Sequence, residues 1–200
     1  MRVILGIGNT GVRYEGTRHN VGFTILDLLA KKRNLKFHPS KGDYYYTGSS
    51  IKASPFILIK PTTFVNLSGV AAKQVIEEHN INPGNLLVVS DDVNLPLGEI
   101  RVRNSGGDGG HNGLTSIIYH INSNQFPRLR FGIGNDFING LMADFVLSKF
   151  SEDELGIIGD AVENSVQLIE KFIENGMESM LSYFSRIKNK SNNNPTDKEG

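Results

Sequence analysis

Residues 2–8, RVILGIG, open the chain with an apolar run that glycines close. The run is long enough for a buried β-strand, and glycines at its end permit a sharp turn. From Asn20 onward the apolar residues recur at the spacing of one helix face, at Val21, Ile25, Leu28 and Leu29. A strand that leads through a glycine turn into a helix is typical of α/β proteins, which carry working residues at such connections.

The same alternation of strand and helix continues after this first unit. We expect a helix over 20–33, extended segments at 44–51, 55–60 and 86–90, and a helix over 68–78 that Ser68 caps. Further along, strands are predicted around Ile100 and Leu129, with a short helix from Leu114 between them. This order predicts an α/β fold: a single-domain three-layer sandwich in which α-helices flank a twisted mixed β-sheet.

The last third of the chain predicts two helices. Ser151 and Glu154 form a capping box ahead of a helix whose inner face carries Leu155, Ile158, Val162, Ile169 and Ile173. Gly176 offers a left-handed stop. A second helix should follow with Met177, Met180, Leu181 and Phe184 inward, and both helices are expected to cover the sheet.

Composition restricts the class of protein. The chain has 200 residues, of which 38% are hydrophobic, and we expect one domain over residues 1–188. Residues 189–200, NKSNNNPTDKEG, have no side chain that could join a core and are predicted to be a disordered tail. No cysteine, leader pattern or long apolar run is present, so a soluble cytoplasmic protein without a membrane partner is expected.

Charge gives no general sign of a nucleic-acid partner, because Lys plus Arg and Asp plus Glu are equal at 21 each. Any such binding must use a local patch. Four arginines alternate outward on two predicted strands and offer one: Arg101, Arg103, Arg128 and Arg130. For each of them a solvated sheet edge explains the position equally well.

One histidine stands at the connection between the first strand and helix. Within YEGTRHNVG, residues 14–22, His19 is placed to act as a base, although a lone histidine there more often caps a helix or bonds a loop carbonyl. A second segment, GGDGGHNG at 106–113, has five glycines in eight residues and exposes backbone N–H groups at a helix start. Such groups suit a phosphate or a developing oxyanion, whereas a flexible connector would not need His111 and Asn112.

Two further segments carry polar groups at strand ends. In PTTFVNLSG, residues 61–69, Asn66 is placed to point outward as donor and acceptor, with an Asx turn as the alternative. In Ser90–Asp92 the two carboxylates point to opposite faces, which suits a histidine partner better than a shared metal. Because the other histidines lack metal-ligand spacing to His19, we predict base catalysis without a metal.

The glycine pattern GIGNTG at residues 6–11 also fits a dinucleotide-binding motif. The context does not, since a helix should open within those glycines and eight residues, VRYEGTRH, intervene instead. We therefore expect no nucleotide cofactor, and interpret the glycines as the turn that directs Asn9 toward a cleft.

Together, YEGTRHNVG, PTTFVNLSG and GGDGGHNGL, with GIGN before them and SDDVNLPLG between, resemble the signature segments of bacterial peptidyl-tRNA hydrolases. They occur in that family's order over roughly residues 1–150. Three positions depart from the family's usual residues, Thr10, Val65 and Asp108. None of them is a principal polar residue, although Asp108 would weaken phosphate contacts.

The resemblance implies an enzyme that hydrolyses the ester between a peptide and the 3′ ribose of tRNA and so recycles abandoned peptidyl-tRNA. His19 would activate water, Asp91 would hold His19, and Asn9 would help to select N-blocked substrates. The substrate and tRNA would be bound by Tyr14, Phe64, Asn66, Asn112 and His111. Phosphate contacts are expected from Arg101, Arg103 and Arg130, with no cofactor, no metal and a monomeric protein.

Two other classes of protein remain as alternatives. An RNA-binding protein on the same scaffold is one, since some relatives of this family serve RNA splicing. His19, Asp91 and Asn66 argue against it, because a protein that only binds needs no base. A nucleotide-cofactor enzyme that uses GIGNTG is the other.

Overall fold

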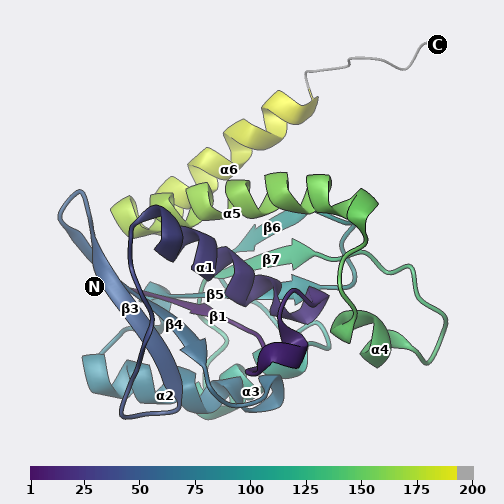
Figure 1. Cartoon of the computed structure of the whole chain (residues 1–200). Coiled ribbons are helices and arrows are strands. Elements are labelled where there is room, and N and C mark those ends of the chain that lie inside the picture. Colours follow the sequence, from purple (N-terminus) through teal and green to yellow (C-terminus); the bar gives the residue numbers. More distant parts are fainter. Residues whose placement is uncertain (193–200) are drawn as a thin grey trace.

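The computed structural model describes residues 1–192, in which one twisted sheet lies between two layers of helices (Figure 1). The strand order is β2-β3-β4-β1-β5-β7-β6. β4, β1, β5 and β7 run parallel, and the outer pairs are antiparallel. The strands are β1 Arg2–Gly6, β2 His38–Pro39, β3 Tyr44–Ile51, β4 Ser54–Pro61, β5 Leu86–Asp92, β6 Ile100–Arg103 and β7 Arg128–Gly132.

The helices cover both faces of this sheet. They are α1 Val21–Lys32, α2 Ser68–His79, α3 Asn112–Ile121, α4 Met142–Leu147, α5 Leu155–Asn175 and α6 Met177–Asn192. Short 3₁₀ turns are η1 Val12–Tyr14, η2 Arg18–Asn20, η3 Val65–Leu67, η4 Pro83–Asn85 and η5 Glu152–Glu154. α1 and α5 pack on one face, α2 and α3 on the other. The predicted three-layer sandwich with a mixed sheet is therefore confirmed.

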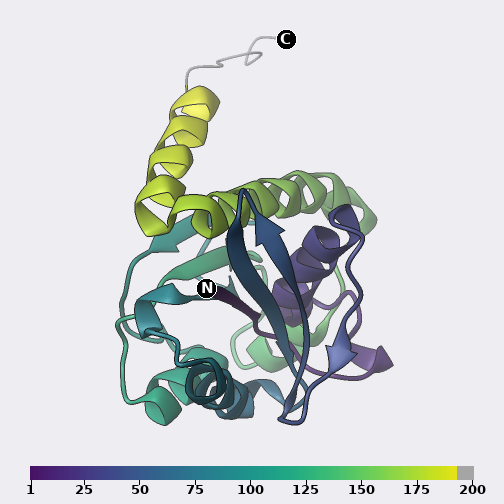
Figure 2. The same ribbon diagram turned by 90° about the vertical axis from the view of Figure 1, so that its left-hand side faces the viewer.

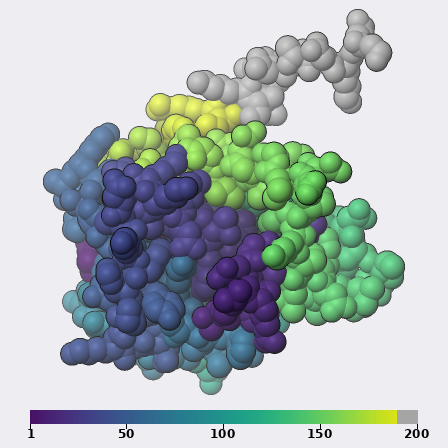
Figure 3. Space-filling view, viewed as in Figure 1, coloured from purple at the N-terminus to yellow at the C-terminus, as the bar shows by residue number. Residues whose placement is uncertain are grey.

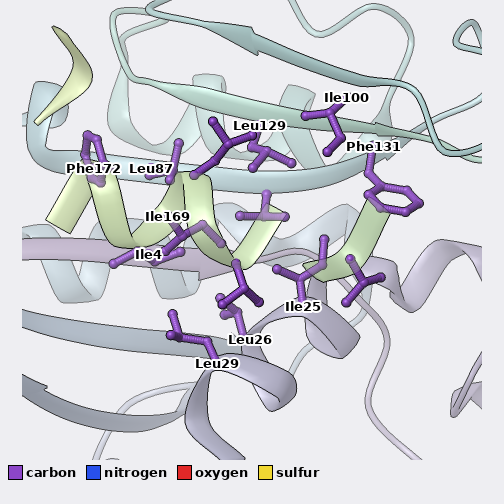
Figure 4. Close-up of a cluster of buried hydrophobic side chains, with 14 of the residues drawn as sticks. Ile4, Ile25, Leu26, Leu29, Leu87, Ile100, Leu129, Phe131, Ile169 and Phe172 are labelled. Atoms are coloured by element: carbon purple, nitrogen blue, oxygen red, sulfur yellow. The ribbon is translucent and has the colours of Figure 1, made fainter. Parts of the chain in front are cut away.

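The core has one apolar cluster on each face of the sheet. Successive side chains of β5 point alternately into the two clusters. Leu87 and Val89 pack toward α1 and α5, and Leu86 and Val88 pack toward α2 and α3. Figure 4 shows the first cluster, where α5 presents Ile169 to the sheet. Burial of each such side chain contributes about 1.5–3 kcal/mol to stability. The continuous apolar run of β5 thus reflects a strand buried on both faces.

Two glycines hold β1 and α1 close together. A Cβ atom on Gly6 would lie 2.6 Å from the carbonyl oxygen of Gly22, and one on Gly22 would lie 2.5 Å from that of Ile7. Neither space admits a side chain. Gly6 therefore serves close packing, while the left-handed backbone of the predicted turn occurs at Gly11, with φ +109°.

Ser68 does not cap α2, contrary to the sequence prediction. It is the first residue of the helix, its backbone is already helical, and its side chain is buried. The preceding turn η3 leads directly into the helix, so Ser68 already has helical dihedral angles, whereas an N-cap residue needs non-helical ones. Leu67 occupies the N-cap position instead.

The C-terminal helices differ in part from the prediction. The Ser151–Glu154 capping box is present, with the Ser151 N–H donating to Glu154 Oε2 at 2.7 Å. Leu155, however, is exposed. α5 covers the sheet, but α6 packs on α5 and projects away from the body (Figure 2). The apolar face of α5 is buried along most of the helix, from Ile158 to Ile173.

The end of the predicted domain can be followed only in part. α6 continues to Asn192, beyond residue 188, and residues 193–200 of the predicted tail lie outside the described residues. Within the described chain, every helix is too short or too polar to cross a bilayer.

Candidate active site

The expected polar residues meet at the carboxyl ends of β1, β4 and β5. These parallel strands end at the same edge of the sheet, where open α/β sheets bind their ligands. A cleft of about 340 Å³ opens there. Its lining includes Asn9, His19, Phe64, Asn66, Asp91, His111, Asn112 and Arg130, and its far wall is formed by Met142, Ala143, Val146 and Leu147 of α4.

Asn9 is fixed at the end of β1 by bonds to its backbone and its side chain. The Asn9 N–H donates to Asn20 Oδ1 at 2.8 Å, and Asn20 Nδ2 donates back to the Asn9 carbonyl at 2.9 Å. The Asn9 side-chain oxygen accepts from the Val65 N–H at 3.0 Å. Because that bond fixes the amide orientation, Asn9 Nδ2 remains as a donor for the cleft.

His19 lies on turn η2 and contacts the carboxylate at the end of β5. Its Nδ1 is 2.8 Å from Asp91 Oδ1, and the two side chains are 15% and 3% exposed. Since the carboxylate accepts, Nδ1 carries the proton and the lone pair of His19 is on Nε2. This is the tautomer that a general base at the cleft requires.

His111, at the N-cap of α3, approaches the same carboxylate oxygen. Its Nδ1 accepts from the Gly113 N–H at 3.0 Å, so its Nε2 carries the proton and donates to Asp91 Oδ1 at 2.9 Å. The rings of His19 and His111 lie 5.2 Å apart. His111 also caps α3, so the free N–H groups expected at this helix start are in part already used.

Burial and hydrogen bonding shift the pKa values of this cluster. Burial alone would lower the pKa of His19, but the hydrogen bond and negative charge of Asp91 outweigh it and the pKa is raised. For Asp91 burial would raise the pKa, yet the hydrogen bonds and electrostatic attraction of His111 and His19 lower it well below the ordinary range. Asp91 is therefore a carboxylate at every physiological pH.

The remaining predicted substrate residues lie at the mouth of the cleft. Asn66 on η3 and Asn112 at the start of α3 line it and are exposed, and among the described residues neither carboxamide has a hydrogen-bond partner. Phe64 lines the cleft and is half exposed, while Tyr14 lies outside the lining and meets the Phe64 ring edge to face at 6.4 Å. No Asx turn forms at Asn66.

The four arginines have different environments. Arg130 lines the cleft and lies with Nε 2.8 Å from Asp92 Oδ2, and Arg101 and Arg103 lie along the edge strand β6. Arg128 is buried rather than outward, contrary to the alternation, because the carbonyls of Gly107 and Asn124 accept from its guanidinium. The Phe126 ring covers it at 4.3 Å.

Two of the positions that depart from the resembled family have defined surroundings. The Val65 side chain is buried, and the Val65 backbone N–H donates to the side-chain oxygen of Asn9. The Asp108 carboxylate accepts from the Gly110 N–H at 2.8 Å within its own loop. Thr10 is exposed and lies outside the lining of the cleft.

One ligand atom each of His19, Asp91 and His111 lies within 4.8 Å of the others, which is also a spacing that a metal ion can use. The sequence reasoning missed this cluster, because the spacing of two histidines along a chain says nothing of their distance in the fold. His111 fits a metal poorly. Its Nδ1 lone pair accepts from the Gly113 N–H, so its Nε2 carries the proton that it donates to Asp91 and has no lone pair for a metal.

Comparison with known proteins decides the family. The family model for peptidyl-tRNA hydrolase matches residues 3–194. The chain belongs to the peptidyl-tRNA hydrolase family. The peptidyl-tRNA hydrolase of Clostridium beijerinckii is 38% identical over 188 residues, covering 94% of this chain and 97% of that protein. That of Caldanaerobacter subterraneus subsp. tengcongensis is 43% identical, covering 92% and 100%.

Solved structures agree with this assignment. A crystal structure of peptidyl-tRNA hydrolase from Acinetobacter baumannii superposes with a TM-score of 0.83 at 29% identity, covering 90% of this chain and 94% of that one. The predicted membership of the peptidyl-tRNA hydrolase family is confirmed, and with it the prediction that the chain is an enzyme of the hydrolase class.

Asn20 is the site residue that the sequence reasoning missed. It reads as the start of a helix in sequence, and no local pattern reveals its contacts with Asn9. We expect Asn20→Ala to lower the free energy of unfolding by about 1–3 kcal/mol, because it leaves the buried N–H and carbonyl of Asn9 unsatisfied. Urea denaturation measures this. Asn82→Ala, which removes one exposed bond to the Gly84 N–H, should cost clearly less; equal costs would contradict the argument.

Proposed function

We propose that this protein hydrolyses the ester bond between the peptide and the 3′ ribose of tRNA, and that His19 activates the attacking water without a metal. One observation carries the proposal: His19 donates through Nδ1 to the buried Asp91 carboxylate, which leaves the basic Nε2 for the cleft. Membership of the family supports the substrate class. Recycling of tRNA from abandoned peptidyl-tRNA is the role that this reaction serves.

The reaction proceeds in two steps. Water attacks the ester carbonyl carbon while its proton passes to His19 Nε2, which gives a tetrahedral oxyanion and an imidazolium that Asp91 stabilises. The bond between that carbon and the ribose 3′ oxygen then breaks, and the imidazolium returns its proton to the 3′ oxygen. The products are tRNA with a free 3′ hydroxyl and a peptide carboxylic acid, which releases its remaining proton to solvent and becomes a carboxylate.

Three asparagines supply neutral groups around the reacting ester. Asn9 Nδ2 is the oriented donor, since its oxygen is held by the Val65 N–H. Asn66 and Asn112 lie at the mouth, and neither carboxamide has a hydrogen-bond partner within residues 1–192. Such donors stabilise an oxyanion without competing for the proton that His19 transfers. Asn9 is also placed to bond the first peptide group of an N-blocked substrate, which a free aminoacyl-tRNA lacks.

The contact of Asp91 with two histidines fits a metal-free mechanism. Two donated hydrogen bonds occupy the side of Asp91 Oδ1 that a metal would need, and His111 retains the proton on Nε2. His111 then holds the carboxylate in position for His19 and does not itself accept the proton of water. This role differs from the substrate contact expected for His111.

We expect the protein, after dialysis against EDTA, to release N-acetylated amino acid from N-acetyl-aminoacyl-tRNA at the rate of the untreated protein, because no step uses a Lewis acid. Release of labelled amino acid over time measures this. Loss of activity on chelation, with recovery on addition of zinc, would establish a metal at His19, Asp91 and His111 instead. Tight tRNA binding with no release over hours would favour the RNA-binding alternative.

A further inference from the structure

Arg18, the residue before His19, is buried and contacts the segment that follows α4. Its Nη2 donates to Glu154 Oε2 at 2.7 Å, its Nη1 to the Ile133 carbonyl at 3.1 Å, and its Nε to Ser148 Oγ at 3.3 Å. The side chain is 8% exposed and lies outside the lining of the cleft.

Two aromatic rings enclose the guanidinium. Its central carbon lies 4.5 Å from the Phe145 ring centre and 4.7 Å from that of Phe150. The backbone adds a further link, since the Arg18 N–H donates to the Ser148 carbonyl at 2.9 Å. Arg18 therefore ties the turn that carries His19 to residues 145–154 through contacts of three kinds.

This segment includes the far wall of the cleft. α4 has six residues, none of them fully buried, and only Phe145 and Val146 pack against the core. Four of its residues line the cleft, whereas Phe145 contacts Arg18. Figure 3 shows the purple N-terminal segment directly against the green segment around residue 150, in agreement with the backbone pairing of Thr17 with Lys149.

A role in stability alone explains these contacts poorly. A buried ion pair seldom stabilises a fold more than apolar side chains of the same volume would. Arginine is the side chain that can donate to several acceptors in one plane while stacking between two rings, and lysine cannot replace it in that arrangement. The contacts thus specify where α4 lies relative to His19.

We propose that Arg18 is a positioning residue that fixes the width of the cleft by docking α4 on the turn that carries His19. The proposal rests on the function proposed above. Arg18 acts on substrate binding and leaves proton transfer unchanged, because the His19 ring is held independently by Asp91 and Asn9 is held by Asn20. Arg18 contacts α4 through Phe145, and the neighbouring α4 residues form the apolar cleft wall that the bound substrate would meet.

We expect Arg18→Gln to raise KM for N-acetyl-aminoacyl-tRNA roughly tenfold, as a modest loss of binding free energy does, while kcat stays within about threefold. The position of the acid limb of the pH profile should stay unchanged, because the contact between His19 and Asp91 remains. Hydrogen exchange of the amides of residues 142–148 should become faster, since α4 loses its main attachment. Arg18→Lys should recover only part of the loss.

Arg33→Gln is the matched control. Arg33 pairs with Glu170 between α1 and α5 at 2.5 Å, a similar ion pair remote from the cleft. Arg33→Gln should leave KM and the amide hydrogen exchange of residues 142–148 at wild-type values. Glu154→Gln keeps the capping box and removes only the negative charge from the contact with Arg18. This variant tests the proposal if Arg18→Gln does not fold.

Wild-type KM together with wild-type exchange at residues 142–148, in folded Arg18→Gln or Glu154→Gln protein, would overturn the proposal. The proposal would also be overturned by a fall in thermal stability with no change in KM or in hydrogen exchange, because that result indicates a structural role alone. The exchange measurement needs no turnover. An inactive wild-type protein would therefore refute the proposed function while the docking of α4 is still tested.

Discussion

His19→Ala is expected to lower kcat/KM for N-acetyl-aminoacyl-tRNA by about 10²–10⁴, the range that a positioned general base contributes. The loss should lie in kcat, because the side chains that bind the ester and the peptide remain. The fold should persist, since Asp91 keeps its bond to His111 and the His19 ring is partly exposed. Initial rates over a range of substrate concentrations measure the effect.

His38→Ala provides the control for this variant. His38 is exposed on β2, at one edge of the sheet, and lies outside the lining of the cleft. Its removal should leave kcat and KM at wild-type values. A His19→Ala protein that kept full activity would show that another group activates the water.

The elements with strong apolar patterns could be predicted from sequence. The first four residues of β5, Leu86–Val89, are an unbroken apolar run because the strand is buried on both faces, and the glycines around β1 and α1 mark their close approach. Local start signals were less reliable. Serine is a residue type favoured at helix N-caps, yet the turn before Ser68 already gives it a helical backbone. No pattern at that position could reveal this.

The cleft residues could be located because each polar group ends a strand, follows a strand or opens a helix. His19, Asp91, Asn66 and Asn112 are all on such connections, and parallel strands bring their carboxyl ends to one edge. The contacts among these residues could not be predicted from the sequence. His111 and His19 share Asp91 only through the packing of α3 and η2 against β5, and alternation misplaced Arg128 because a buried arginine needs acceptors that tertiary structure supplies.

The wall of the cleft formed by α4 gave no signal in sequence. Its residues, MADFVL, are apolar at several positions, as those of a core helix would be, and yet none is buried. An apolar side chain that faces a cleft and one that faces a core look alike in a single sequence. Arg18 shares this ambiguity, because its partners come from segments more than a hundred residues away.

Asp91→Asn is expected to lower kcat/KM by up to roughly 10⁴, the loss seen when the orienting carboxylate of a histidine base becomes an amide and the tautomer is wrong. Both histidine N–H groups share Asp91 Oδ1, so a neutral carboxamide oxygen in its place accepts them more weakly, and a carboxamide turned to present Nδ2 offers neither of them an acceptor. His19 then has no fixed proton on Nδ1, and its Nε2 is no longer always the basic nitrogen.

The pH dependence separates this explanation from simple loss of structure. On the proposed mechanism kcat/KM should rise with pH as His19 loses its proton. Because Asp91 raises the pKa of His19, this acid limb should lie above the ordinary value of 6.5. Without the negative charge the pKa of His19 falls, and the residual activity of Asp91→Asn should show its acid limb at lower pH. Asp92→Asn removes the adjacent carboxylate, which faces Arg130, and should leave the limb in place. An acid limb that stayed in place in Asp91→Asn, with a folded protein and a normal rate, would mean that the carboxylate neither orients nor charges the base.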